Sequence, residues 1–132
     1  MSKLLDKLQS DYPEVVFKEG GRFSFRPPKT ITIGPIEEHG DLLLLHELGH
    51  YASSHRDFTT DAKRIKMERE AWEKARELAA QYNVDFNEDV VEEEMDTYRN
   101  WLDNRSRCKK CGLSCYQSED GKYHCPRCEN FI

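Results

Sequence analysis

The fold is decided by residues 42–51, LLLLHELGHY, in which four leucines precede an HExxH sequence. On a helix, His46 and His50 project from one face, one turn apart, so both imidazoles can bind one zinc ion at about 2.0–2.1 Å. Glu47 is offset by about 100° and can accept a proton from an activated water. HExxH also arises by chance in ordinary helices. The motif supplies only two ligands, and a catalytic zinc needs a third protein ligand elsewhere in the chain.

The segments before this motif predict a helix and a small sheet. Residues 3–9 have apolar side chains at helical spacing. Residues 14–34 alternate apolar and polar side chains and contain a Gly-Gly and a Pro-Pro pair, which favours two or three short antiparallel strands. The HExxH helix itself is expected at residues 41–54, with Asp41 as its N-cap.

The segments after the motif predict two long helices. The first is expected at residues 61–82, with Asp61 as a cap and Asn83 as a stop, and the second at residues 88–102. Residues 103–107 are polar and are predicted to form a hinge. We therefore expect an α+β fold, in which a short antiparallel sheet packs on the HExxH helix and two further helices.

The third zinc ligand is expected on the helix at residues 61–82. Among its glutamates, Glu68 falls on the apolar stripe, whereas Glu70 falls on the other side and can pair with Lys74. The stripe consists of Ile65, Ala71, Trp72, Ala75, Leu78, Ala79 and Tyr82. An inward carboxylate is costly unless a cation offsets it, so Glu68 is the predicted ligand and Glu70 the reserve. The alternative is that Glu68 is an ordinary, partly buried helix residue.

These residues carry a family resemblance. HELGH followed by Glu68-x-x-Ala71, with Ala75 and Leu78 continuing the helix, resembles the ImmA/IrrE-type metallopeptidases within the gluzincins. The short chain is also similar to the minimal, single-domain minigluzincin proteases. The resemblance covers roughly residues 40–80.

The resemblance implies a function for the motif. His46, His50 and Glu68 would hold a catalytic zinc, and Glu47 would act as general base in peptide-bond hydrolysis. Trp72 departs from the family pattern, because relatives often have an Asn or Asp there that supports a histidine.

A further hydrogen-bond donor is needed for the developing oxyanion. Tyr98 and His55 are the two candidates in the sequence. The simpler interpretations are that Tyr98 is a core residue of its helix and that His55 is a loop residue.

A second metal site is predicted near the C-terminus from two CxxC pairs separated by thirteen residues. Four thiolates on two turns can close a tetrahedral zinc site, as in a zinc ribbon, which this segment resembles. The predicted ligands of this structural zinc are Cys108, Cys111, Cys125 and Cys128. Gly112 follows the first pair, where a positive φ is often required. The alternative is four unrelated cysteines.

Two potential ligands remain outside these pairs, Cys115 and His124. Cys115 could replace a ribbon ligand, remain a free thiol or reach the catalytic zinc. The sequence assigns no role to His124.

We predict two domains, a minimal zinc metallopeptidase at residues 1–104 and a zinc-ribbon module at residues 105–132. The ribbon has a basic edge suited to contact with nucleic acid or protein, although a solvated surface is the simpler interpretation. This edge consists of Arg105, Arg107, Lys109, Lys110 and Arg127.

Composition limits the classes of protein that fit. The 132 residues are 34% charged with a net charge of -5, which argues against a nucleic-acid-coating protein. The N-terminus lacks the apolar core of a signal peptide and no run is long enough to span a membrane, so we expect a cytoplasmic protein. The leading hypothesis is a zinc metalloendopeptidase that acts on a protein or peptide. The alternative is a catalytically silent, protease-like module whose ribbon recognises protein or nucleic acid.

Overall fold

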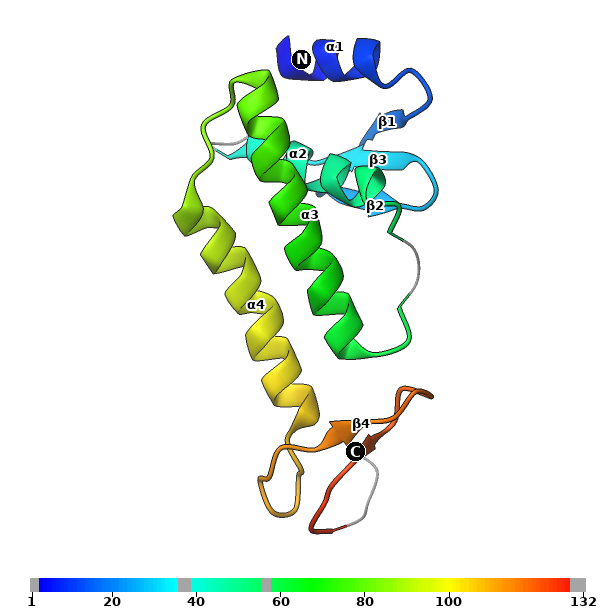
Figure 1. The fold of residues 1–132 in the computed structure, drawn as a ribbon, viewed down its shortest axis with the longest axis vertical. Helices are drawn as coiled ribbons and strands as arrows, with labels where there is room; N and C mark the ends of the chain where they lie inside the picture. Colours follow the sequence, from blue (N-terminus) through cyan, green and yellow to red (C-terminus); the bar gives the residue numbers. More distant parts are fainter. Residues whose placement is uncertain (1–2, 36–38, 56–57, 129–132) are drawn as a thin grey trace.

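The computed structural model describes residues 3–35, 39–55 and 58–128, and this part of the chain has an α+β fold with four helices and two small sheets. The elements in chain order are α1 (Lys3–Asp11), β1 (Val16–Glu19), β2 (Ser24–Arg26), β3 (Thr30–Ile33), α2 (Gly40–Ala52), α3 (Asp61–Tyr82), α4 (Glu88–Ser106), β4 (Tyr116–Gln117) and β5 (Tyr123–His124). Figure 1 shows α3 and α4 running side by side, with the first sheet at one end and the β4–β5 hairpin at the other. The last four residues of the predicted ribbon module lie outside the described residues.

The ends of α3 have clear local causes. The helix stops at Asn83, which adopts the left-handed conformation with φ of 56°, and the predicted stop is therefore confirmed. At the other end the cap is Thr60, whose Oγ1 accepts a hydrogen bond from the backbone N–H of Lys63. The prediction of Asp61 as cap is wrong by one residue, and this frees the Asp61 carboxylate for a different contact.

Two other boundary predictions are also wrong. Helix α2 begins at Gly40 with His39 at the N-cap position, so Asp41 lies in the first helical turn. There its negative charge still favours the helix N-terminus. Helix α4 continues to Ser106, and the polar segment 103–107 is therefore mostly its last turn rather than a hinge. An ion pair between Asp103 and Arg107, one turn apart, supports this extension.

The first sheet is mixed, with the strand order β1-β3-β2. Strands β2 and β3 are antiparallel as predicted, but β1 and β3 are parallel, so the prediction of a wholly antiparallel sheet is wrong. Strand β3 carries Ile31 and Ile33, both buried, whereas β1 and β2 have no buried residue. The most apolar strand therefore takes the centre of the sheet, and it pairs on one side with a strand that runs in its own direction.

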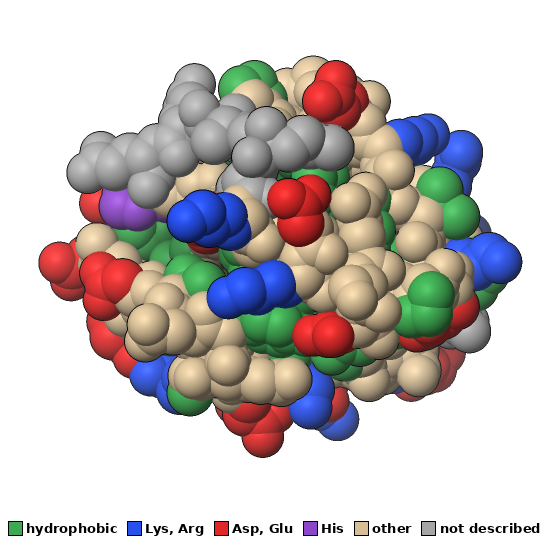
Figure 2. All heavy atoms as spheres, turned by 90° about the horizontal axis from the view of Figure 1, so that it is seen from above, with side chains coloured by type: hydrophobic (Ala, Val, Ile, Leu, Met, Phe, Trp, Pro, Cys, Tyr) green, Lys and Arg blue, Asp and Glu red, His purple; other side chains and the backbone are tan. Residues whose placement is uncertain are grey.

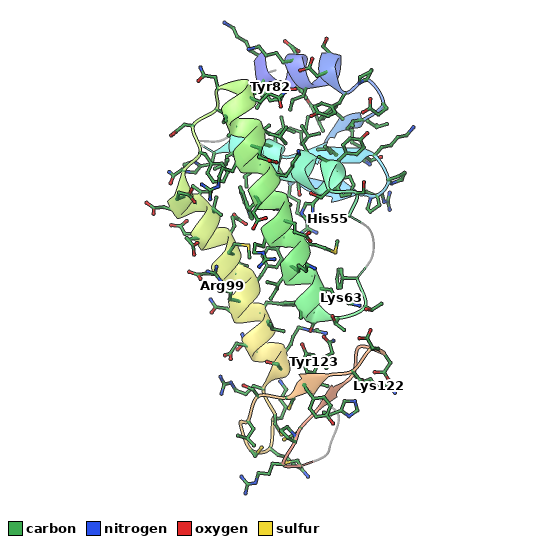
Figure 3. The ribbon with its side chains drawn as sticks, viewed as in Figure 1. His55, Lys63, Tyr82, Arg99, Lys122 and Tyr123 are labelled. Atoms are coloured by element: carbon green, nitrogen blue, oxygen red, sulfur yellow. The ribbon has the colours of Figure 1, made fainter. Side chains whose placement is uncertain are left out.

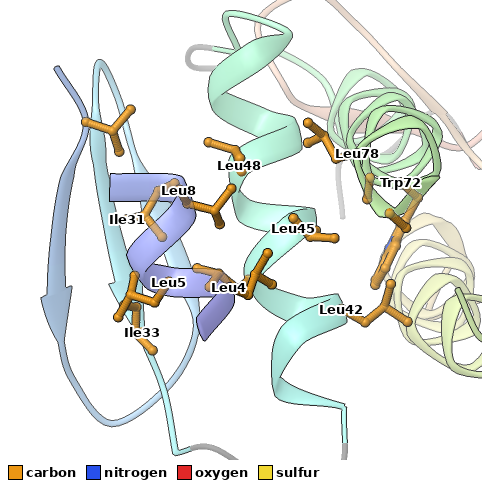
Figure 4. Close-up of a cluster of buried hydrophobic side chains, with 14 of the residues drawn as sticks. Leu4, Leu5, Leu8, Ile31, Ile33, Leu42, Leu45, Leu48, Trp72 and Leu78 are labelled. Atoms are coloured by element: carbon orange, nitrogen blue, oxygen red, sulfur yellow. The ribbon is translucent and has the colours of Figure 1, made fainter. Parts of the chain in front are cut away.

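One apolar core connects α1, the first sheet and the long helices. Figure 4 shows α1 next to both the sheet and α2, with Leu8 near Ile31, and with α3 on the far side of α2. The largest fully buried aliphatic side chains of this core are Leu8, Ile31, Leu45, Leu48 and Leu78. Three of the four leucines that precede the HExxH motif are buried, which fixes the rotation of α2 about its axis.

The surface carries charges of both signs. Figure 2 shows acidic and basic side chains interspersed with apolar ones on the face seen from the α1 end. Among residues 3–35, 39–55 and 58–128, no helix combines the length and apolar character needed to cross a membrane.

Candidate metal centres

The first candidate centre depends on a close approach of α2 and α3. A Cβ atom at Gly49 would overlap the backbone carbonyl of Ala71 on the neighbouring helix. Only glycine allows this spacing, and Ala71 and Ala75 are themselves small and fully buried. The contact brings the histidine-bearing face of α2 against the part of α3 that carries Glu68.

His46, His50 and Glu68 converge at this contact. Nε2 of His46 lies 3.1 Å from Oε1 of Glu68, and Nε2 of His50 lies 2.8 Å from Oε2. Two ligand atoms bound at about 2.0–2.1 Å to a tetrahedral zinc are about 3.3 Å apart, so little adjustment is needed to admit an ion. All three ligand atoms lie within 4.8 Å of one another, and the group could hold a metal ion.

The electrostatics of the three side chains suit metal binding. Burial lowers the pKa of His46 by more than the neighbouring Glu68 raises it. Burial alone would raise the pKa of Glu68, but hydrogen bonds from His46 and His50 outweigh it and hold that pKa well below its usual range. A neutral imidazole and an ionised carboxylate are the forms that bind metal.

Glu47 is buried beside this group but is not part of it. The residue is 7% exposed, and its Oε2 has no hydrogen-bond partner among the described residues. Burial raises the pKa of Glu47 to about 7, against an opposing effect of His50. A carboxyl group with a pKa near neutrality can both accept and return a proton, as a general base must.

A cleft of about 440 Å³ gives access to these groups, and Glu47, His50 and Glu68 line it. Its other walls include Phe25 of β2, Arg64 of α3 and Tyr98 of α4. A separate cavity of about 240 Å³ lies between α1, the first sheet and the start of α2, and none of the predicted ligands lines it. The chemistry-bearing residues therefore face the first cleft.

Trp72 supports His46 by stacking. The two ring centroids are 4.1 Å apart and the ring planes differ by 25°. Nδ1 of His46 has no hydrogen-bond partner among the described residues, so the stack on Trp72 and the contact of Nε2 with Glu68 orient the imidazole.

His50 is supported by a polar contact that the sequence did not reveal. Its Nδ1 lies 2.8 Å from Nδ1 of His55, and Nε2 of His55 lies 3.7 Å from Oε1 of Glu70. When Nε2 of His50 binds a metal, its Nδ1 carries the hydrogen and donates it to His55. Glu70, the reserve ligand, therefore lies behind His55, while Glu68 lies at the histidine pair.

The second candidate centre contains the four predicted cysteines. Sγ of Cys108 lies 3.9 Å from Sγ of Cys128, and the sulfurs of Cys111 and Cys125 are 3.6 Å apart. A disulfide requires about 2.05 Å, whereas two thiolates bound at about 2.3 Å to a tetrahedral zinc are about 3.8 Å apart. The four sulfurs lie within 4.8 Å of one another and could hold a metal ion.

Local backbone geometry prepares this cluster. The backbone N–H of Cys128, 3.4 Å from Sγ of Cys125, lowers the pKa of that thiol to about 6 against the opposing effect of burial. Gly112 has a φ of 77°, as predicted for the turn after the first pair. The first feature favours the thiolate form of Cys125, the form in which cysteine binds metal, and the second allows the tight turn after Cys111.

The remaining potential ligands, Cys115 and His124, are not part of the four-cysteine group. Sγ of Cys115 is 3.8 Å from the carbonyl oxygen of Leu113, and burial raises the pKa of Cys115 to about 11. Nε2 of His124 lies 3.0 Å from Oγ of Ser118, and its ring stacks on Tyr116. Cys115 is therefore a protonated thiol next to the cluster rather than one of the four grouped sulfurs.

Asp61 joins the ribbon to α3. Its carboxylate is buried and accepts hydrogen bonds from the hydroxyl of Tyr123 at 2.5 Å and from Nε of Arg105 at 2.8 Å. Its backbone N–H donates to Oε1 of Gln117 at 2.6 Å. Figure 3 places Tyr123 just below the start of α3, whereas Tyr82 lies near α1 at the other end. One helix therefore carries a ribbon anchor at its first residue and the predicted ligand Glu68 two turns later.

Comparison with known proteins gives no family assignment, because no protein-family model, curated protein or solved structure matches the chain. The chemistry of the two groups is therefore judged from their geometry. Sequence patterns had singled out all seven residues of the two groups, but not the contact of Trp72 with His46 or that of His55 with His50. Trp72 lies one turn after Glu68 on the same helix, and this spacing is the signal that could have found its contact.

Proposed function

We propose that the chain is a zinc-dependent metalloendopeptidase, with His46, His50 and Glu68 as the zinc ligands and Glu47 as the general base. One observation carries the proposal. Glu47, a buried carboxylate with a pKa of about 7, lines one cleft together with His50 and Glu68, and those two side chains form with His46 a group that could hold a metal ion. A purely structural site would have no use for this additional carboxylate, which is costly to bury.

In the proposed reaction, His46, His50 and Glu68 would hold a zinc ion, which would supply an activated water and a Lewis acid for the scissile carbonyl. Glu47 takes the proton from that water and later delivers it to the leaving amine. Trp72 and His55 hold the rings of His46 and His50 in fixed orientations, which keeps both Nε2 atoms aimed at Glu68. The peptide lies in the cleft, between β2 and α4.

Tyr98 is the proposed donor to the developing oxyanion. It lines the cleft from α4, and burial together with the charge of Glu68 raises the pKa of its hydroxyl well above the ordinary value. The hydroxyl therefore keeps its proton at neutral pH and can donate a hydrogen bond. His55 fits this role less well, because its Nδ1 already contacts His50.

The four-cysteine group is proposed to hold a structural zinc. Four thiolates complete a tetrahedral shell, so no position remains for water or substrate. Strands β4 and β5 have two residues each, and the segment has too little apolar core to fold without a metal. The hydrogen bonds at Asp61 connect this structural zinc site to α3.

The proposal is tested by zinc content and proteolysis of the same preparation. Two zinc ions per chain are expected, and unfolded casein should be cleaved. Glu47→Gln should retain both ions and lower the cleavage rate by about 10²–10⁴-fold, because it removes the general base without removing a ligand. Equal cleavage by Glu47→Gln and the parent would show that the enzyme hypothesis is wrong.

A matched control is available on α4. Glu94 is exposed, and its charge acts on Glu47 from outside the metal group. Glu94→Gln makes the same chemical change and should leave the cleavage rate within a few fold of the parent. If the parent and Glu94→Gln both fail to cleave casein or peptides while both zinc ions are bound, the catalytically silent binding module becomes the better description.

A further inference from the structure

We infer that Arg64 forms an anion-binding subsite in the cleft, which selects peptides with a carboxylate near the scissile bond. The carboxylate is either an Asp or Glu side chain or the C-terminal carboxylate of a short peptide. This inference rests on the proposed peptidase function, and it adds a substrate preference to it.

The position of Arg64 places it beside the reaction. It lies one helical turn before Glu68 on α3, and residues four apart on a helix lie on the same face with Cβ atoms about 6 Å apart. Both side chains line the same cleft, which Tyr98 of α4 also lines. A group bound to Arg64 is therefore within a few residues of a peptide bond held at Glu47.

Aromatic side chains hold the guanidinium without using its hydrogen-bond donors. Its Cζ atom lies 4.6 Å from the ring centroid of Trp101, 5.4 Å from that of Tyr98 and 5.5 Å from that of Phe58. Stacking on a ring uses the face of a guanidinium and leaves the N–H groups at its edge available. Those edge groups match a carboxylate in a two-point contact.

The ion pairs of α3 and α4 set Arg64 apart. In these two helices, all of which the structure describes, every other arginine has a carboxylate within 4.0 Å. These pairs are Arg69 with Glu73, Arg76 with Glu88, Arg99 with Glu92 and Asp96, and Arg105 with Asp61. Arg64 has no such partner among the described residues, although it is half-buried.

Helix stability does not account for a cation at this place. Arg64 lies in the first turn of α3, where the helix dipole disfavours positive charge. The cleft also contains Glu47 and Glu68, which would repel the carboxylate of a substrate. Arg64 offsets that repulsion, and Arg22, exposed at the rim of the cleft, adds a second positive charge.

The competing interpretation is that Arg64 only braces α3 against α4 through Trp101 and Tyr98. A brace would affect stability equally for every ligand, whereas a subsite would affect the ratio of affinities for charged and neutral peptides. Binding to zinc-loaded Glu47→Gln measures that ratio without turnover. The probes are pairs of short fluorescent peptides that differ only in Glu or Gln, each made with a free or an amidated C-terminus.

We expect the preferred carboxylate peptide to bind about tenfold more tightly than its neutral partner, as one charge-assisted contact allows. Adding Arg64→Gln should reduce the ratio to about one. Lys66→Gln, the matched control, removes the same charge from an exposed position on α3 and should preserve the ratio. Arg64→Lys, which keeps the stacking cation but lacks the planar fork, should give an intermediate ratio and serves if the Gln variant is unstable.

The two kinds of peptide pair identify the source of the carboxylate. A Glu/Gln ratio that depends on Arg64 assigns the subsite to an acidic side chain, and an acid/amide ratio that does so assigns it to the C-terminus. The inference is overturned if both ratios are near one before substitution, or if they survive in Arg64→Gln and Arg64→Lys. Casein cleavage by the parent tests the peptidase proposal separately, so a subsite without proteolysis and proteolysis without a subsite are distinct results.

Discussion

The His46–His50–Glu68 group and the four-cysteine group both hold ligand atoms near the spacing of a tetrahedral zinc shell, but their surroundings differ. The first lies between two long helices of the apolar core and opens on a cleft. The second lies on short turns beside two strands of two residues each. The apolar core therefore holds the first group in place on its own, whereas we propose that the second group depends on a bound metal for its folding.

Removing one ligand from each group tests this difference most strongly. Cys125→Ser should abolish the ribbon zinc and unfold the segment after α4, because structural zinc contributes on the order of 10 kcal/mol of folding free energy. His50→Ala should abolish the other zinc while α2 and α3 stay folded. Zinc content and amide hydrogen exchange report both outcomes. If the backbone amides after α4 stayed protected from hydrogen exchange in Cys125→Ser, the proposed difference between the two groups would be wrong.

The second prediction concerns which glutamate completes the open group. Glu68→Gln should weaken zinc binding at the histidine pair by more than about 100-fold, because it removes a ligand. Glu70→Gln should weaken it by only about tenfold, because Glu70 acts through His55 on the orientation of His50. Competition with a zinc chelator measures both. Equal losses in the two variants would place Glu70 in the ligand set.

The sequence alone could distinguish Glu68 from Glu70, but it could not show the contact through which Glu70 acts. Helical spacing placed Glu68 on the buried stripe of α3, and the structure does bury Glu68 and leave Glu70 half-buried. Spacing reports which face of a helix turns inward, but not which side chain of another element meets it. The contact between His50 and His55 depends on the chain turning back after α2, which no periodicity records.

The helices of the fold could be predicted from the sequence, but the order and direction of the strands could not. All four helices were expected from apolar spacing, and Asn83 ends α3 as predicted. The parallel pairing of β1 with β3 was not, because alternation of apolar residues identifies strands without giving their order. The polar segment 103–107 resembled a hinge, but Arg107 and Asp103 pair across a helical turn instead. The domain boundary between residues 104 and 105 stays a prediction.

The third prediction concerns the contact that joins the two regions. Asp61→Asn removes the charge that Arg105 and Tyr123 surround, and it should lower the unfolding free energy of the zinc-loaded protein by about 3 kcal/mol. Asp103→Asn is the matched control, since the exposed pair of Asp103 with Arg107 is worth less than about 1 kcal/mol. Denaturant unfolding of the two variants measures the difference.

The effect of Asp61 should depend on pH. Burial would raise the pKa of Asp61, but hydrogen bonds from Tyr123 and Arg105 hold it below the ordinary value of 3.8. A carboxyl group with a lowered folded-state pKa stabilises the protein above its unfolded pKa, and this contribution is lost as the pH falls through the folded value. The parent and Asp61→Asn should therefore differ fully at neutral pH and converge only below about pH 3.8. Convergence already at pH 6 would exclude Asp61 as the anchor.

The smallest predicted effects come from one glycine in each region. Gly49→Ala should cost about 2 kcal/mol and weaken zinc binding at the histidine pair, because the new methyl group meets the carbonyl of Ala71 and separates α2 from α3. Gly112→Ala should cost only about 1 kcal/mol, since nothing lies within 4 Å and the cost is its positive φ. Gly112→Asn, which tolerates that conformation, should recover part of the loss, whereas Gly49→Asn should be worse than Gly49→Ala. Thermal unfolding and zinc titration separate the two cases. If both alanine variants kept the histidine zinc at parental affinity, the close contact of the helices would not be what positions Glu68.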